Sequence, residues 1–250
     1  MGSVEFVIKE HIGTITFGHP QSNSLPGKTL QLLAHTISDM GADTSVRVII
    51  LKSIGDKAFC AGASFDELIA INDFETGKTF FSGFAKVINA CRLSPKLIIG
   101  RVQGKAVGGG VGIASATDYC YATQRADVKL SELAVGIGPF VVGPAVQRKI
   151  GLAAMSELAI NASEWRSAEW AMSKGLYNQV FDTVEQMDMA IHQLATKLSL
   201  SNPKAMSELK KVFWEGTENW DRLLIDRAEI SGQLVLSEFT KEAIKAFKSQ

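Results

Sequence analysis

The chain has 250 residues, of which 46% are hydrophobic, and its 26 basic and 26 acidic side chains give a formal net charge of zero. This balance leaves no electrostatic footprint for nucleic acid or an anionic membrane, and no apolar run reaches the length of about 18 residues that suggests a membrane span. The first residues also lack the apolar core of a signal peptide, so the sequence predicts a cytoplasmic protein with neither kind of partner.

The first half of the chain alternates between strand-like and helix-like segments. Residues 4–17 predict two short strands around a turn, and apolar residues at helical spacing predict a helix over 29–40. Further strands are expected at 46–53, 96–102 and 118–123, a helix at 79–91, a helix start at Gly108 and a short edge segment at 129–133. Such alternation is typical of a parallel α/β arrangement.

After about residue 161 the pattern becomes helical. We expect a helix that starts near Ser167 and ends at Gly175, and another that begins with Pro203 at its first position. Amphipathic helices are also expected over 220–236 and 240–247. The only shift in composition lies near 185–200, so the domain prediction is a core over 1–195 and a helical region over 196–250.

A cluster of glycines between Gly104 and Gly112 needs an explanation, because glycine weakens the interior of a helix or strand by about 0.5–1 kcal/mol relative to alanine. A phosphate-binding Walker loop would need glycine at Ile99 and a hydroxyl residue at Ala106. A dinucleotide-binding GxGxxG would need glycine at Ile113 or Ser115, according to its register. Both phosphate-binding readings fail, whereas tight packing of helix against strand stays open.

A strand, a turn and then glycines at a helix start describe a possible oxyanion hole. The first backbone N–H groups of a helix have no helical partner, and the helix dipole adds partial positive charge there. Without side chains in the way, a ligand oxygen can reach those N–H groups. The segment "AFCAGASFDEL" (58–68) repeats this pattern after the preceding strand, so each turn could supply one donor.

Several linked segments resemble the enoyl-CoA hydratase/isomerase (crotonase) superfamily over nearly the whole chain. They are "KAFCAGASFDEL" (57–68), "KLIIGRVQGKAVGGGVGIASATDY" (96–119), "LSELAVGIGP" (130–139), "SAEWAMSKGLYNQV" (167–180) and the turn "HPQSNSL" (19–25). The resemblance implies an α/β fold with a spiral core of ββα units, followed by C-terminal helices that drive trimer formation. It implies a homotrimer or a dimer of trimers.

The resemblance also implies an acyl-CoA substrate whose thioester carbonyl lies between the N–H groups of Ala63 and Gly109. No metal and no separate cofactor is expected, because coenzyme A is part of the substrate. Residues near the two turns are expected to contact it: Ala61, Ser64, Phe65, Lys105 and Gly108. Phe247 and Lys248 in the final helix resemble residues that border a neighbouring subunit's coenzyme A.

The resemblance implies that hydratases of this family use two glutamates. This chain retains one of them. The retained residue is Glu132 in "SEL", whereas the other position is Gly112. Asp118 does not replace it, because at about 100° per residue it lies on another face of the helix, and it matches a structural aspartate of the family. We therefore predict Glu132, with Ala63 and Gly109, as the catalytic set.

The missing glutamate favours isomerisation over hydration. Adding water divides naturally between two carboxylates, whereas moving a double bond needs one base and an oxyanion hole, the pattern that ketosteroid isomerase shows. The apolar stretch 136–143 resembles that of the family's Δ3-Δ2 enoyl-CoA isomerases and could exclude water and raise the pKa of Glu132. An enoyl-CoA hydratase and a non-catalytic acyl-CoA-binding scaffold remain the alternatives.

Two further expectations concern cysteines and assembly. Cys60, Cys91 and Cys120 are isolated and odd in number, which argues against a disulfide framework or a zinc site.

The helix over 220–236 carries an apolar face that we expect to be too large to stay exposed on a monomer. Its apolar residues are Leu223, Leu224, Ala228, Ile230 and Leu234.

Overall fold

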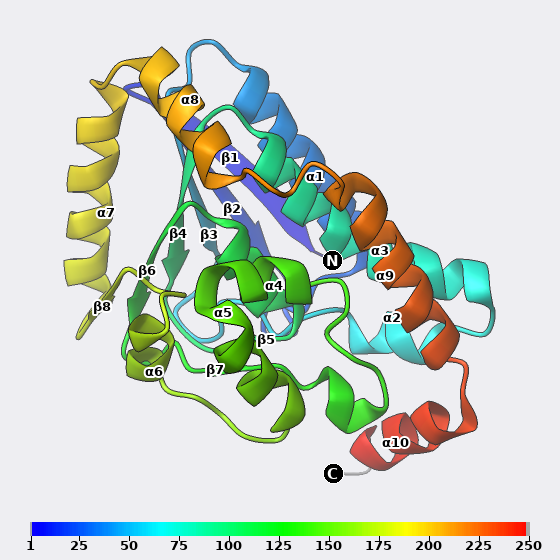
Figure 1. Cartoon of the computed structure of the whole chain (residues 1–250). Coiled ribbons are helices and arrows are strands. Elements are labelled where there is room, and N and C mark those ends of the chain that lie inside the picture. Colours follow the sequence, from blue (N-terminus) through cyan, green and yellow to red (C-terminus); the bar gives the residue numbers. More distant parts are fainter. Residues whose placement is uncertain (1, 249–250) are drawn as a thin grey trace.

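A computed structural model describes residues 2–248 and shows a twisted sheet with helices on both faces (Figure 1). The order of the main sheet is β1-β2-β3-β4-β6-β8, with β1 antiparallel to β2 and the later neighbours parallel. Its strands are β1 (Ser3–Lys9), β2 (Ile12–Gly18), β3 (Val48–Ser53), β4 (Leu97–Val102), β6 (Tyr119–Thr123) and β8 (Gln179–Phe181). The predicted parallel α/β arrangement is confirmed.

Alternation along β3 shows how the sheet separates two apolar layers. Ile49 and Leu51 point into the main core with helices α1 (Gly27–Ala42) and α3 (Phe74–Leu93). Val48 points to the other face, where it packs with Met187 and Ile191 of the helix α7 (Val184–Ser199). Successive side chains of a strand face opposite sides, so this uninterrupted apolar run fits a strand buried on both faces.

The remaining helices follow the capping signals of the sequence. The helix α8 (Pro203–Phe213) has Pro203 in its first turn, as predicted, and the Asn202 side chain accepts hydrogen bonds from the N–H groups of Lys204 and Ala205. The others are α2 (Phe65–Ala70), α4 (Gly109–Ala116), α5 (Gly143–Ile160), α6 (Ala168–Ser173), α9 (Trp220–Leu234) and α10 (Glu238–Lys248). None of the helices described is both long and apolar enough to cross a membrane.

The second half is less purely helical than the sequence pattern indicated. The strand β8 joins the main sheet beside β6 within the region expected to be helical. The Asn178 side chain accepts a 2.7 Å hydrogen bond from the Cys120 N–H, and the Asn178 N–H donates to the Cys120 carbonyl. The helix α5 was not predicted either.

A two-stranded parallel sheet supports the predicted turns. It pairs β5 (Ala106–Val107) with β7 (Val128–Lys129). The short edge segment expected at 129–133 is confirmed only at its start, because Glu132–Val135 forms a 3-10 helix, η1. Cys60, Cys91 and Cys120 are buried free thiols.

The C-terminal helices pack on the chain's own core (Figure 1). The helix α9 runs against α3, where Gly77 and Gly232 let the two backbones approach so closely that a Cβ on Gly77 would lie 3.1 Å from the Gly232 Cα. Leu224 and Ala228 are fully buried there. Of the apolar face that we expected to require a neighbouring subunit, Leu223 and Leu234 are only half-buried and Ile230 is 38% exposed, so assembly through this face stays a prediction.

Candidate active site

The two small-residue turns after β3 and β4 lie against each other, as predicted. The Val107 N–H donates a 2.9 Å hydrogen bond to the Cys60 carbonyl, and the Phe59 N–H donates to the Lys105 carbonyl. A Cβ on Gly110 would lie 2.4 Å from the Cys60 carbonyl oxygen, and one on Gly62 would lie 3.7 Å from the Gly109 nitrogen. Glycine is thus required where the two backbones touch, which explains the triple glycine.

The backbone conformation of the turns leaves two N–H groups available. Gly62 has φ +92° and Gly108 has φ +51°, a region that side chains rarely enter. The carbonyls around Ala63 are fixed, because Gly62 accepts from the Leu25 N–H and Ala63 accepts from the Ser24 hydroxyl. Within residues 2–248, the N–H groups of Ala63 and Gly109 donate none of the hydrogen bonds that the structure shows.

The carboxylate of Glu132 lies directly beside this pair of turns. The Gly108 N–H donates to the Lys129 carbonyl, which holds the segment before η1 against the start of α4. A Cβ on Gly108 would lie 2.9 Å from Glu132 Oε1, so only a residue without a side chain leaves room for the carboxylate. Glu132 is not an exposed surface charge, because its Oε2 is buried and lacks a hydrogen-bond partner among the described residues.

Burial raises the pKa of the Glu132 carboxyl to about 7, although a hydrogen bond from its own backbone N–H opposes part of the rise. Desolvation disfavours the charged form of a carboxyl group. A carboxylate that gains and loses protons near neutrality is suited to act as both base and acid. A carboxylate with one buried oxygen that lacks a partner, beside two N–H groups that donate no hydrogen bond within residues 2–248, is therefore a strong indication of catalysis.

We expect kcat/KM to rise with pH as Glu132 loses its proton, with its midpoint at the pKa of about 7. The base must be ionised to accept a proton from carbon. The pH–rate profile of the purified protein, with an acyl-CoA substrate below saturation, measures this midpoint. A midpoint near the ordinary glutamate value of about 4.3 would contradict the apolar environment described here.

The same pKa shift predicts that Glu132 destabilises the fold at high pH. The folded protein holds the proton between about pH 4.3 and 7, where the unfolded chain has released it, so stability is lost as pH rises through this window. Glu132→Gln is expected to avoid a loss of about 3–4 kcal/mol, so its Tm should exceed that of the wild type above pH 7 and match it below pH 4. Glu164→Gln, at an exposed position, is the control, and equal Tm values at pH 8 would contradict the expectation.

An apolar side chain occupies the space next to the position of the missing glutamate. A Cβ on Gly112 would lie 2.5 Å from Val142 Cγ1. Val141 and Val142 are 5% and 4% exposed, so these two side chains are buried, and the exclusion of water by the stretch 136–143 stays a prediction. Pro139 and Phe140 are only half-buried. The structure therefore has no room for a second carboxylate at 112 unless Val142 moves or changes.

Sequence reasoning missed the residues that enclose the site from the C-terminal end. The Thr240 hydroxyl on α10 donates a 3.0 Å hydrogen bond to the Gly136 carbonyl at the end of η1. A separate apolar cluster lies between α3, η1 and the C-terminal helices and consists of Ile71, Phe80, Ile137, Val235 and Ile244, with Ala63 and Phe65 packed against it. The Phe84 ring covers Gly109, since its Cζ lies 2.1 Å from where a Cβ on Gly109 would be.

The predicted coenzyme A contacts all lie on or beside the two turns, but their side chains differ in exposure. Ala61, Phe65 and Gly108 lie on the two turns or at the adjoining helix start. Ser64 is buried and caps α2, with its Oγ accepting a hydrogen bond from the Glu67 N–H. Lys105 is exposed, and its Nζ lies 4.4 Å from the centre of the Trp165 ring.

Two other candidates cannot be placed. The side chains of Phe247 and Lys248 lie outside what the structure describes.

Comparisons with known proteins identify the family. A sequence profile described as "Enoyl-CoA hydratase/isomerase" matches residues 7–249. The chain is 30% identical over 239 residues to a short-chain-enoyl-CoA hydratase of Clostridium acetobutylicum, which covers 94% of this chain and 90% of that protein. It is 30% identical over 203 residues to the carnitinyl-CoA dehydratase of Escherichia coli K12, with 80% and 75% covered.

Among solved structures, an enoyl-CoA hydratase from Bacillus halodurans superimposes with a TM-score of 0.90 at 21% identity. The match covers 97% of this chain and 99% of that one. It shows that the two chains share one fold.

Proposed function

Because this chain belongs to the enoyl-CoA hydratase/isomerase family, we propose that it moves a carbon–carbon double bond in an acyl-CoA thioester, with Glu132 as its acid–base group. The observation that supports the proposal most is the position of Val142, whose side chain occupies the space that a side chain at position 112 would need. An apolar side chain fills the place beside 112, while the carboxylate that remains is buried next to two free N–H groups.

The proposed reaction is Δ3-Δ2 isomerisation, which needs no water. Glu132 removes a proton from C2 of a 3-enoyl thioester, and the electron pair left behind spreads over C2, C4 and the thioester oxygen. The N–H groups of Ala63 and Gly109 stabilise the negative charge on that oxygen, which is the part of the transition state that differs most from the substrate. The protonated Glu132 then returns the proton to C4, which leaves a 2-enoyl thioester and regenerates the carboxylate.

Hydration is the second candidate, and the names of the relatives favour it. The relative from Clostridium acetobutylicum is named a hydratase, and that from Escherichia coli a dehydratase. A hydratase needs a second group to hold and deprotonate water, or one carboxylate must do both tasks. Val142 obstructs a second catalytic group at position 112, because its side chain fills that space.

An exchange experiment in deuterated water separates the candidates. We expect deuterium to enter C2 and C4 of a 3-enoyl-CoA, with the 2-enoyl product formed and little 3-hydroxyacyl product, as mass spectrometry and NMR would show. A 3-hydroxyacyl product formed as fast as the exchange would favour the hydratase instead. Tight binding of the thioester without exchange would indicate a scaffold that binds acyl-CoA without acting on it.

A paired substitution tests whether Gly112 and Val142 decide between the reactions. Gly112→Glu alone is expected to cost about 1–3 kcal/mol of stability, because its Cβ would collide with Val142. Combined with Val142→Ala, the new carboxylate has space, and we expect measurable hydration of a 2-enoyl-CoA. Val142→Ala alone is the control and should stay without hydration. A folded double variant that hydrates no faster than this control would contradict the proposed role of position 112.

The remaining expectations are proposed together with the function. The reaction needs only proton transfer and N–H donors, so we propose that the enzyme works without a metal or separate cofactor. We also propose a cytoplasmic homotrimer or dimer of trimers. Light scattering at micromolar concentration tests the assembly, and a monomer would contradict it.

A further inference from the structure

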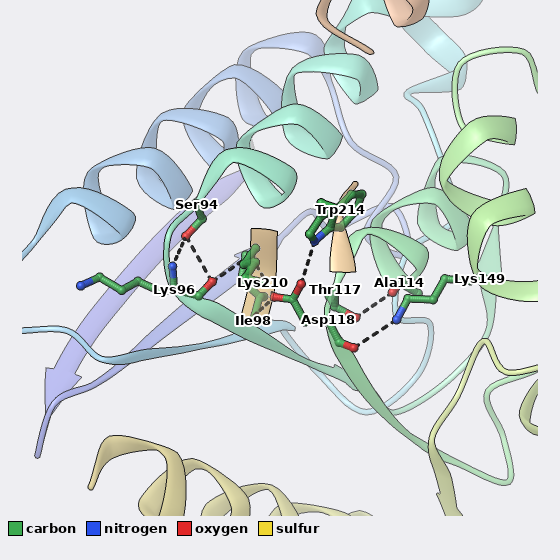
Figure 2. A network of polar contacts seen from close by, with 9 residues as sticks. All are labelled: Ser94, Lys96, Ile98, Ala114, Thr117, Asp118, Lys149, Lys210 and Trp214. Atoms are coloured by element: carbon green, nitrogen blue, oxygen red, sulfur yellow. Dashed lines mark hydrogen bonds and ion pairs between the residues drawn. The ribbon is translucent and has the colours of Figure 1, made fainter. Parts of the chain in front are cut away.

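A buried network around Asp118 lies at the end of α4 opposite Gly109 (Figure 2). Asp118 Oδ2 accepts hydrogen bonds from the Ile98 N–H at 2.7 Å and from Lys210 Nζ at 2.9 Å, and Oδ1 accepts from Trp214 Nε1 at 2.9 Å. The Asp118 and Lys210 side chains are 4% and 3% exposed. The expected structural role of Asp118 is confirmed, and its negative charge is balanced by Lys210.

Two further cations of α5 adjoin this network without a carboxylate of their own. Lys149 Nζ donates a 3.2 Å hydrogen bond to the Asp118 backbone carbonyl, and the Arg148 guanidinium lies 5.0 Å from the centre of the Trp214 ring. Neither residue forms an ion pair with any described part of the chain. Since Lys210 already neutralises Asp118, about two positive charges remain unbalanced here.

These cations line a cavity. Its volume is about 250 Å³, and its walls are Ser115, Thr117, Asp118, Arg148, Lys149, Phe213 and Trp214. The hydroxyls of Ser115 and Thr117 donate to backbone carbonyls of α4, so the positive groups are the donors left for a ligand. Arg148 also lines a second cavity of about 440 Å³, together with Arg227 of α9 and Glu215, which lies between α8 and α9.

We propose that this cavity binds the phosphate group of a small organic phosphate, at a site distinct from Glu132. Two unbalanced cations match a phosphate, which carries about −1.5 to −2 at neutral pH, better than they match a single carboxylate. The Arg148 guanidinium and the Lys149 ammonium are the donors for its oxygens. The second cavity accommodates the organic part of the ligand.

Binding of inorganic phosphate to the full-length protein tests the proposal. We expect saturable binding by calorimetry and broadening of the ³¹P signal, at constant ionic strength with chloride as the replacement. Arg148→Met and Lys149→Met should each weaken binding by about 10- to 100-fold, the equivalent of one hydrogen bond to a charged group. Arg222→Met is the control, because this exposed arginine pairs with Asp226 on the outer surface of α9.

Three results would overturn the proposal. The first is an absence of saturable phosphate binding to the wild type. The second is acetate binding as tightly as phosphate, since this would show that the two cations do not select a doubly charged group. The third is dissociation of an oligomer by Arg148→Met, with phosphate binding unchanged, because this would assign the cations to an interface between copies. Arg148 is exposed, so its variant is expected to fold.

Discussion

Glu132→Gln is expected to reduce turnover by a factor towards the upper end of the range of about 10²–10⁴ that general acid–base catalysis contributes. In the proposed reaction one carboxylate removes the proton and returns it, so its loss affects both steps. The substitution keeps the size of the side chain beside Gly108. The rate of deuterium exchange at C2 and C4 measures the effect separately from product release.

The affinity for an acyl-CoA thioester should change little in this variant. The N–H groups of Ala63 and Gly109 and the turns that present them are independent of the carboxylate's charge. Glu164→Gln, which alters an exposed glutamate, should keep wild-type exchange. If Glu132→Gln exchanged at nearly the wild-type rate, another group would be the base and the proposed mechanism would fail.

Substitution of Gly109 is expected to have the next largest effect. Removal of one oxyanion donor typically costs about 10²–10³ in kcat. Gly109→Val should approach a complete loss, because its side chain would collide with the buried Phe84 ring and displace the N–H. The variant is also expected to lose stability, because overpacking costs about 1–3 kcal/mol.

A smaller pair of variants separates catalysis from stability at this position. Gly109→Ala introduces a single methyl group, and Phe84→Ala removes the ring with which that methyl would collide. We expect the double variant to keep the N–H in place and so to recover turnover relative to Gly109→Ala. Gly143→Ala is the control, because its added Cβ would meet only the flexible end of Met155 at 3.2 Å. Full activity in Gly109→Val would show that the oxyanion assignment is wrong.

The parts of the site that the sequence predicted correctly are those with a local signal. Glycines that follow a strand and begin a helix indicate that another segment of backbone lies close to them. The closeness of Cys60 and Gly110 could therefore be inferred without coordinates. The position of Glu132 followed from the resemblance to a family. Its burial and raised pKa are properties of the surroundings, which the structure supplies.

The parts that were missed depend on contacts between apolar residues far apart in the chain. Val142 lies thirty positions from Gly112, and Phe84 meets Gly109 from another helix. Such residues look like ordinary core positions, because helical spacing shows which face is buried and not what covers it. The strand β8 was missed because three residues give little periodicity, and its pairing with β6 stabilises it.

The contact between α10 and η1 bears on whether the activity of one subunit depends on its neighbours. The Thr240 hydroxyl that bonds to Gly136 and the Ile244 side chain in the adjoining apolar cluster belong to the same polypeptide as Glu132. Each subunit therefore encloses its site at this end with residues of its own chain, whatever the number of copies in the assembly. In a mixture of active and Glu132→Gln subunits, the total rate should therefore fall in proportion to the fraction of inactive copies, without dominance of one over the other.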